Sequence, residues 1–150
     1  MADLKELYQQ VILDHSKRPR NFHQNADATR TAEGFNPLCG DRITIYLTID
    51  GDTITDVSFS GSGCAICTSS SSMMTQFLKG KSLEQAGEVF VKFRDLVRGR
   101  VEAIDVIDEL DKLAAFSGVC EFPIRVKCAT LPWHTMKAAL ESEQGVVSTE

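Results

Sequence analysis

The chain lacks most of what membrane, secreted and nucleic-acid-binding proteins need. No stretch of its 150 residues approaches the roughly 20 apolar residues of a membrane span, and the start, Met1 to Glu6, lacks the apolar segment of a signal peptide. Lysine and arginine number 16 against 21 acidic residues, and the resulting net charge of -5 argues against a nucleic-acid surface. These shortages predict a cytoplasmic protein without membrane or nucleic-acid partners.

The cysteines do not form a disulfide framework. There are five, an odd number, and a chain of 150 residues is long enough to bury a core without cross-links. In a reducing compartment, such cysteines are ligands, nucleophiles or core residues. We therefore expect one domain over residues 1–150, with a loose polar tail over about 142–150.

Three helices are predicted from apolar residues that recur at helical spacing. The first ends before Pro19, and the third is capped by Ser82 and Gln85. The second begins just after Cys64 and closes at Gly80. Cys64 is therefore expected at a helix N-terminus, where free backbone N–H groups and the helix dipole favour the thiolate.

Extended structure is predicted between the first two helices. Apolar and polar residues alternate over residues 43–49, and Asp50-Gly51-Asp52 turns the chain into residues 53–60. This pattern is typical of an antiparallel hairpin. Residues 29–33 show a weaker pattern that adds a short edge strand.

The C-terminal third has weaker patterns. A further helix is predicted over residues 104–110, and Gly118 is expected to end this helical region. Pro123 is expected to open only a short turn that carries Cys128. A last helix is then expected to start at Thr130.

Three cysteines in unlike contexts suit a thiolate site. Cys39 and Cys64 follow turn-forming residues, so their side chains are placed to converge from loops, and Cys128 lies far along the chain. Asp41 adds a carboxylate oxygen two residues after Cys39. Three sulfurs and one carboxylate suit a tetrahedral zinc ion, and the same set suits an iron–sulfur cluster with one labile corner. Ligand type alone leaves the metal open.

The remaining cysteines have competing interpretations. Cys64 and Cys67 spell C-x-x-C, typical of a redox pair or half a zinc site, but a hairpin precedes them instead of a strand of a βαβ unit. Cys67 shares a helix face with Cys64 and is the alternative ligand in place of Asp41. Cys120 is expected to be a core residue or a spectator thiol, and His15 to be structural.

Five motifs spread along the chain belong together: Leu7-Tyr8 through Asp14-His15, Pro19-Arg20-Asn21, Asn36 to Asp41, Gly61 to Cys64 with Ser69 to Met74, and Arg125 to Leu131. Together these motifs resemble the U-type iron–sulfur assembly proteins over residues 4–140. Two features match the SufU branch more closely than the IscU scaffolds: Lys127 stands before Cys128 where the scaffolds carry a histidine, and the helical segment over 80–118 is longer than in those scaffolds.

The resemblance implies an α+β fold with a three-stranded antiparallel sheet packed against several helices on one side. It implies a zinc ion held by Cys39, Asp41, Cys64 and Cys128. It further implies a zinc-dependent sulfurtransferase that accepts persulfide sulfur from a PLP-dependent cysteine desulfurase of the SufS type and passes it to the iron–sulfur cluster assembly machinery. Cys39 matches the receiving thiol, and Arg125 matches a basic residue just before the last ligand.

Two other functions use the same residues. A scaffold would assemble a transient 2Fe–2S cluster with Asp41 as a labile ligand, and a structural zinc module would keep four stable ligands. Lys127 disfavours the scaffold, and the loop position of Cys39 disfavours the structural module. The chain departs from the family at Cys67, where a small polar residue is common, and at Pro132, which is expected to interrupt the last helix.

Overall fold

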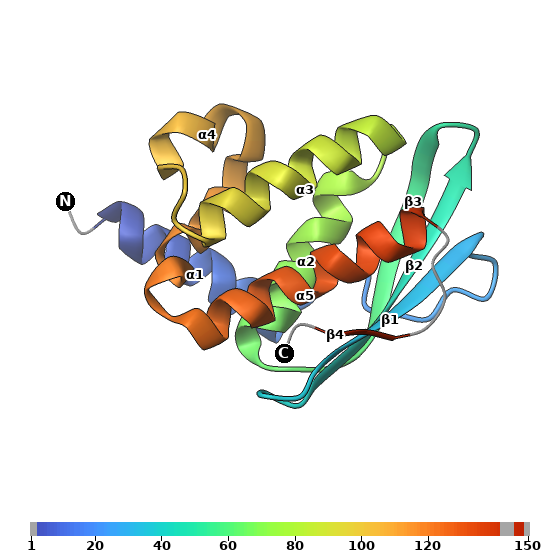
Figure 1. The fold of residues 1–150 in the computed structure, drawn as a ribbon, viewed down its shortest axis with the longest axis horizontal. Coiled ribbons are helices and arrows are strands. Elements are labelled where there is room, and N and C mark those ends of the chain that lie inside the picture. The colour runs from blue at the N-terminus through green and yellow to red at the C-terminus, as the bar shows by residue number, and fades with distance from the viewer. Residues whose placement is uncertain (1–2, 142–145, 149–150) are drawn as a thin grey trace.

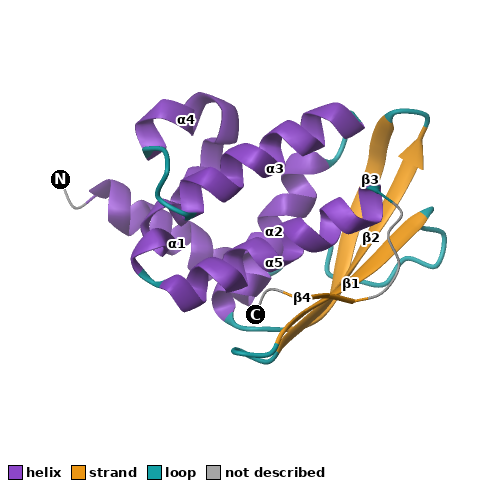
Figure 2. Ribbon diagram, viewed as in Figure 1, coloured by secondary structure: helices purple, strands orange, loops and turns teal. Residues whose placement is uncertain are grey.

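The structure, a computed structural model, describes residues 3–141 and 146–148. Within these residues, helices and one sheet form separate layers, with the helices gathered on one side of the sheet (Figures 1 and 2). The predicted α+β architecture is confirmed. The elements in chain order are α1 (Asp3–Lys17), β1 (Arg30–Asn36), β2 (Asp41–Asp50), β3 (Thr53–Ser62), α2 (Ala65–Leu78), α3 (Leu83–Val97), α4 (Ala103–Leu110), the 3₁₀ helix η1 (Asp111–Glu121), α5 (Pro123–Leu140) and β4 (Val146–Ser148).

The sheet has the strand order β3-β2-β1-β4. The predicted three-stranded antiparallel sheet is confirmed in β3, β2 and β1, with Ile45 of β2 opposite Phe59 of β3 and Ala32 of β1. β4 adds a short parallel pairing to β1, so β1 is an inner strand and not the predicted edge. Of the tail predicted to be loose, residues 142–145 and 149–150 lie outside the described residues.

β1 extends beyond the weak pattern that predicted it. Its inward positions are Ala32, Gly34 and Asn36, which are small or polar and therefore give little hydrophobic alternation. A Cβ atom on Gly34 would overlap the Thr135 side chain of α5. Glycine at this position therefore allows α5 to pack directly on the strand.

The core lies between the sheet and the helices. β2 directs Ile43, Ile45 and Leu47 inward, where each is at most 2% exposed. On the helical side, the rings of Phe93 and Trp133 stack with centroids 4.7 Å apart. Burial of this apolar surface holds α3 and α5 together and sets α5 against the sheet.

The serine-rich segment of α2 is buried because its hydroxyl groups bridge neighbouring helices. Ser70 Oγ donates to the Ala129 carbonyl at 2.6 Å and accepts from Trp133 Nε1 at 3.1 Å. Ser72 Oγ lies 2.7 Å from His15 Nδ1. Buried polar atoms need such partners, so α2 is held to α5 on one face and to α1 on another. His15 thus has the structural contact that the sequence predicted.

The C-terminal helices correct three predictions. η1 continues through Gly118 to Glu121, and α5 is a continuous helix of 18 residues that includes Cys128. Pro123 stands at the start of α5, where its missing N–H costs nothing. Pro132 removes only the bond to the Cys128 carbonyl, and the buried neighbours Leu131 and Trp133 keep the helix together. The predicted end of the helical region at Gly118, the short turn at Pro123 and the interrupted last helix are therefore wrong.

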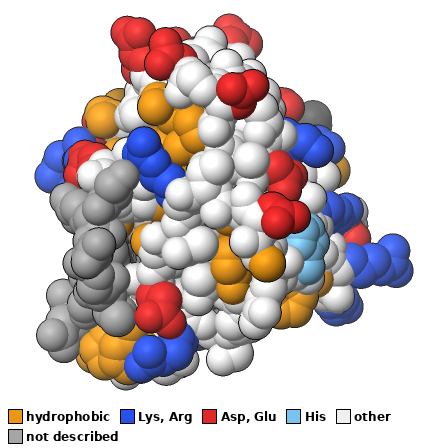
Figure 3. All heavy atoms as spheres, turned by 90° about the vertical axis from the view of Figure 1, so that its right-hand side faces the viewer, with side chains coloured by type: hydrophobic (Ala, Val, Ile, Leu, Met, Phe, Trp, Pro, Cys, Tyr) orange, Lys and Arg blue, Asp and Glu red, His pale blue; other side chains and the backbone are white. Residues whose placement is uncertain are grey.

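The surface carries mixed charge. On the face drawn in Figure 3, acidic and basic side chains stand among small apolar patches. Within the described residues, no helix has both the length and the apolarity needed to cross a bilayer.

Candidate metal centre

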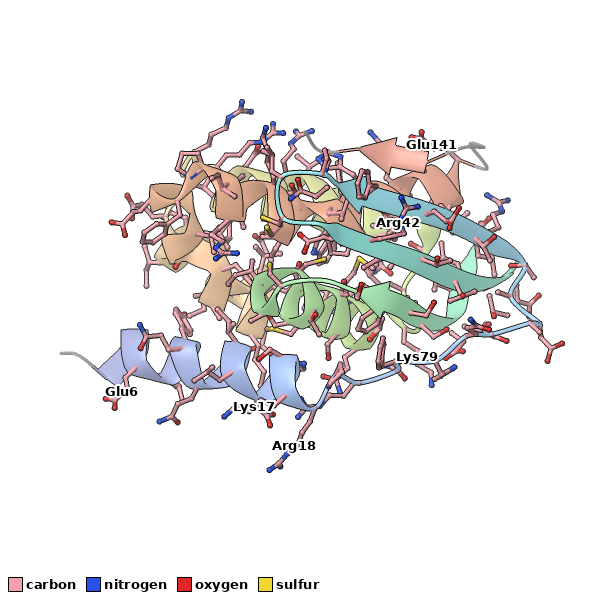
Figure 4. The ribbon with its side chains drawn as sticks, turned by 90° about the horizontal axis from the view of Figure 1, so that it is seen from below. Glu6, Lys17, Arg18, Arg42, Lys79 and Glu141 are labelled. Atoms are coloured by element: carbon pink, nitrogen blue, oxygen red, sulfur yellow. The ribbon has the colours of Figure 1, made fainter. Side chains whose placement is uncertain are left out.

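The site lies where the β1–β2 turn, the first turn of α2 and the second turn of α5 meet. Cys39 is in the turn over residues 37–40, Asp41 is the first residue of β2, Cys64 is the N-cap of α2, and Cys128 is on α5. Gly40 has φ +70, a left-handed conformation that glycine adopts without strain and that closes this turn. Seen from below, sulfur atoms gather beside the turn, between α2 and α5 (Figure 4).

The structure brings three of the predicted ligands into one group. Ligand atoms of Cys39, Asp41 and Cys128 all lie within 4.8 Å of one another. The Cys128 Sγ–H donates to Cys39 Sγ at 3.1 Å. Asp41 and Cys128 are fully buried, whereas Cys39 is half-buried. The group therefore has two enclosed donors and one that solvent reaches.

Cys64 borders the group through two hydrogen bonds. Its backbone N–H donates to Asp41 Oδ1 at 2.8 Å, and its thiol is hydrogen-bonded to Cys128. The Asp41 carboxylate thus satisfies one of the free N–H groups at the start of α2. Cys64 is the fourth predicted ligand, and its hydrogen bond with Cys128 places its side chain at the edge of the group.

The pKa values of the Cys64 and Cys128 thiols are shifted in opposite directions. The hydrogen bond with Cys128 lowers the pKa of Cys64 to about 6, and the Cys67 N–H adds to this effect against burial. The same hydrogen bond raises the pKa of Cys128, and burial raises it further. The hydrogen bond between the two thiols therefore favours the loss of one proton from the pair.

Arg125 reaches the site from the exposed first turn of α5. The negative charge of Cys64 raises the pKa of the Arg125 guanidinium, and a hydrogen bond between Arg125 and Cys128 raises it further. Beside it is an open hollow of about 340 Å³, lined by Cys39, Arg125 and residues 121–124. Cys39, the predicted receiving thiol, and Arg125, the predicted basic residue, therefore line the same hollow.

Asn36 is a member of the site to which the sequence assigned no role. Its Nδ2 donates to Asp41 Oδ2 at 3.5 Å and to Cys128 Sγ at 3.6 Å. Its Oδ1 accepts from the Leu38 N–H at 3.2 Å and so shapes the turn that carries Cys39. An asparagine directly before a proline-containing turn is the sequence signal that could have identified this residue.

The other two cysteines lie outside the group. Cys67 is fully buried, and this burial, followed by the negative charge of Asp41, raises the pKa of its thiol well above the usual value. Cys120 is exposed and packs beside Gly99. The charge of Asp41 therefore acts on Cys67 as it does on Cys64.

The donor set fits zinc. Thiolates and a carboxylate are common zinc ligands, and all four predicted donors come from this corner of the molecule. A fully buried carboxylate is costly unless a cation compensates its charge. Within the described residues, no ion pair involves Asp41, so a bound cation would supply that compensation.

Comparisons with known proteins agree with these motifs and this geometry. The zinc-dependent sulfurtransferase SufU of Bacillus subtilis is 44% identical over 96% of this chain and 96% of its own length. The iron–sulfur cluster assembly scaffold protein IscU of Streptococcus pyogenes is 40% identical over 94% of this chain and 87% of its own.

A solved structure and a family model also match. A structure described as a cluster assembly scaffold protein for the SUF system of Fervidobacterium islandicum has a TM-score of 0.81 and 36% identity, covering 90% of this chain and 97% of its own. The family model of the NifU-like N-terminal domain matches residues 7–144. This chain therefore belongs to the NifU-like N-terminal domain family, and the resemblance to its SufU branch is confirmed.

Proposed function

We propose that this chain is a zinc-dependent sulfurtransferase of iron–sulfur cluster assembly. In the cytoplasm it accepts persulfide sulfur from a PLP-dependent cysteine desulfurase of the SufS type and passes it to the assembly machinery. The observation that carries the proposal is the half-buried Cys39, whose sulfur lies 3.1 Å from that of the enclosed Cys128. The relative from Bacillus subtilis, named a zinc-dependent sulfurtransferase, supports it.

Cys39, Asp41, Cys64 and Cys128 would hold the zinc ion. When bound, zinc keeps its cysteine ligands deprotonated and shields them from oxidation. Asp41 and Cys128 are fully buried on a strand and a helix, so they are fixed members of the set. Cys64 is fixed as well, because its N–H is held by Asp41 at 2.8 Å.

Cys39 is the residue that can leave this set and react. It lies on a turn with exposed residues on both sides, Leu38 and Gly40, and turns move more readily than strands or helices. Its thiolate attacks the outer sulfur of the donor persulfide, forming a new S–S bond. The donor cysteine leaves as a thiolate, so Cys39 now carries the persulfide.

Arg125 assists by its position at the opening. Its guanidinium lies on the exposed turn of α5, where it faces the thiolates and borders the same hollow as Cys39. A guanidinium is always charged and binds anionic groups through several N–H donors. It would therefore attract the anionic persulfide and stabilise the negative charge on Cys39.

Metal content and desulfurase turnover together test the proposal. Protein purified without added iron is expected to contain about one zinc per chain, because structural sites of this donor type bind zinc tightly. Addition of this protein is expected to raise the turnover of a SufS-type desulfurase, and Cys39→Ser to remove that stimulation. Zinc-free protein with intact ligands, or unchanged turnover, would argue against the assignment.

A cluster scaffold is the second candidate function. Relatives at 40% and 36% identity are named scaffold proteins, and the same donors suit a 2Fe–2S cluster with Asp41 as the labile ligand. Anaerobic addition of iron and sulfide separates the two functions. A scaffold would assemble a cluster and pass it to an apo-ferredoxin, whereas the proposed sulfurtransferase would keep zinc and transfer no cluster.

A further inference from the structure

The C-x-x-C pair contains a cysteine that sulfur transfer does not use. We propose that Cys64 and Cys67 form a reversible disulfide when the metal-free protein meets a peroxide, and that this disulfide competes with the metal for Cys64. The proposed disulfide rests on the geometry at the start of α2 and does not depend on a bound metal. The competition rests on the proposed zinc site.

The first turn of α2 places the two residues as a dithiol pair. Cys64 is the N-cap, with φ −68 and ψ 170, and Cys67 is the third helical residue. The extended backbone of Cys64 folds its side chain over the first turn, where Sγ accepts from the Cys67 N–H at 3.5 Å. C-x-x-C pairs at helix N-termini are the usual setting of reactive protein dithiols.

The sulfur of Cys67 faces the segment that leads to Cys64. A Cβ atom on Gly63 would lie 3.2 Å from both Cβ and Sγ of Cys67, a distance shorter than ordinary van der Waals contact. Glycine at 63 therefore lets the chain pass directly over the Cys67 thiol just before it reaches Cys64. Both thiols lie against the same turn of backbone.

The different exposure of the two thiols determines which of them reacts with the peroxide first. Cys64 is half-buried and Cys67 fully buried, so a peroxide reaches Cys64 first. The Cys64 thiol attacks the peroxide O–O bond to give a sulfenic acid, and one water leaves. The Cys67 sulfur then attacks the Cys64 sulfur, the S–S bond forms, and the hydroxyl leaves as a second water with the Cys67 proton. Two thiols are oxidised and one hydrogen peroxide is reduced to two waters.

Cys128 offers the two competing pairings, with Cys39 and with Cys64. Its sulfur is 3.1 Å from that of Cys39 and its thiol is hydrogen-bonded to Cys64, but the contact with Cys39 joins residues 89 positions apart and depends on an exposed turn. Cys64 and Cys67 are instead held by one helical turn, so they stay close when the turn over residues 37–40 moves. We therefore expect the Cys64–Cys67 disulfide to form even when Cys39 is absent.

Peptide mapping of the full chain tests the proposal. Zinc-loaded and chelated wild-type proteins are treated with hydrogen peroxide, their free thiols are alkylated, and zinc content is measured beforehand. The chelated protein is expected to yield a Cys64–Cys67 disulfide that a thiol reductant reverses. In the zinc-loaded protein, its formation should be slower on the order of tenfold or more, because a metal-bound thiolate is shielded.

Different results test the Cys64–Cys67 disulfide and its competition with the metal separately. A Cys39–Cys128 or Cys64–Cys128 disulfide without the Cys64–Cys67 disulfide, or Cys64 found as a sulfinic acid in the wild type, would refute the pair. Equal oxidation of samples shown to differ in zinc content would refute the competition alone. A chain that binds no zinc would instead count against the proposed function and leave the mapping of the metal-free protein as the test of the pair.

Matched variants identify the resolving thiol. Cys39→Ser is expected to keep the Cys64–Cys67 disulfide, and Cys120→Ser to behave as wild type. Cys67→Ser is expected to keep zinc and to oxidise Cys64 irreversibly, because no neighbouring thiol remains in the turn. A Cys67→Ser protein in which Cys64 is mapped in a disulfide with another cysteine would show that this other cysteine is the partner.

Discussion

The candidate metal centre has an enclosed side and an open side, which differ in the elements that carry them. Asp41 and Cys128 are fully buried on a strand and a helix, and Asn36 donates hydrogen bonds to both. Cys39 and Arg125 lie on a turn and on an exposed helix start, beside the same hollow. The difference indicates a division of work in which the enclosed side holds the metal and the open side reacts.

Removal of zinc should have the largest effect on stability. Because the enclosed side forms a site only in the folded chain, a bound ion stabilises the fold by about 4 kcal/mol when free zinc exceeds its Kd by about 1,000-fold. Chelation is therefore expected to lower the melting temperature markedly, and added zinc to restore it. Differential scanning calorimetry with and without a chelator checks this, and an unchanged melting temperature would contradict it.

Asp41→Ala should disrupt the enclosed side itself. It removes a predicted ligand and leaves the partly buried Cys64 N–H without its acceptor, which costs up to about 1–3 kcal/mol. We expect lower zinc occupancy and a lower free energy of unfolding in urea. Cys67→Ser is the matched control and is expected to keep zinc; the reverse pattern, with zinc lost only in Cys67→Ser, would make Cys67 the fourth ligand.

Arg125→Ala should affect only the open side. Its exposed guanidinium contributes little to stability, so sulfur transfer is expected to slow by about threefold to tenfold while zinc content stays unchanged. Arg125→Lys keeps the charge and should recover part of the rate. Single-turnover transfer from the desulfurase measures this, and loss of zinc in Arg125→Ala would place the residue on the enclosed side instead.

The smallest effect is expected at His15, far along the chain from both sides. Burial lowers the pKa of His15, and the positive charge of Arg20 adds to this, so the unfolded chain takes up a proton at higher pH than the folded chain. Stability should therefore fall as the pH drops through the ordinary histidine value of about 6.5. His15→Gln should lose less stability than wild type on acidification and keep its zinc and activity.

Urea unfolding at about pH 8 and about pH 5.5, on either side of the ordinary histidine pKa, measures the difference. His134, whose pKa is lowered by burial, and Cys64, whose pKa is lowered by its hydrogen bond with Cys128, contribute the acid sensitivity that remains. If His15→Gln and wild type lost equal stability, the sensitivity would belong to these other groups.

Much of the fold could be predicted because several elements have strong local patterns. The alternation of Ile43, Ile45 and Leu47 identified the hairpin, and the capping box of Ser82 and Gln85 identified the start of α3. β1 was only partly found because its inward residues are small or polar.

The errors arose where packing overrides a local signal. α5 was missed as one helix because Pro132 breaks helices in most contexts, and here tertiary packing outweighs one lost hydrogen bond. β4 pairs with β1 through a distant part of the chain, which hydrophobic periodicity does not report.

The site was predictable in its chemistry but not in its contacts. The donor types of Cys39 and Asp41, and the position of Cys64 at a helix N-terminus, follow from the sequence, and Cys64 is indeed the N-cap of α2. The contact between Cys39 and Cys128 joins residues 89 positions apart, so only the fold shows it. The role of Asn36 depends on the same convergence.

The most direct test of this division of work locates the transferred sulfur. Wild-type protein is incubated with a SufS-type desulfurase and cysteine labelled with a heavy sulfur isotope, and its peptides are mapped by mass spectrometry. The account predicts labelled persulfide on Cys39, and a Cys39→Ser protein that keeps its fold but carries no label. Label on Cys64, Cys67 or Cys128 with Cys39 unmodified would contradict it.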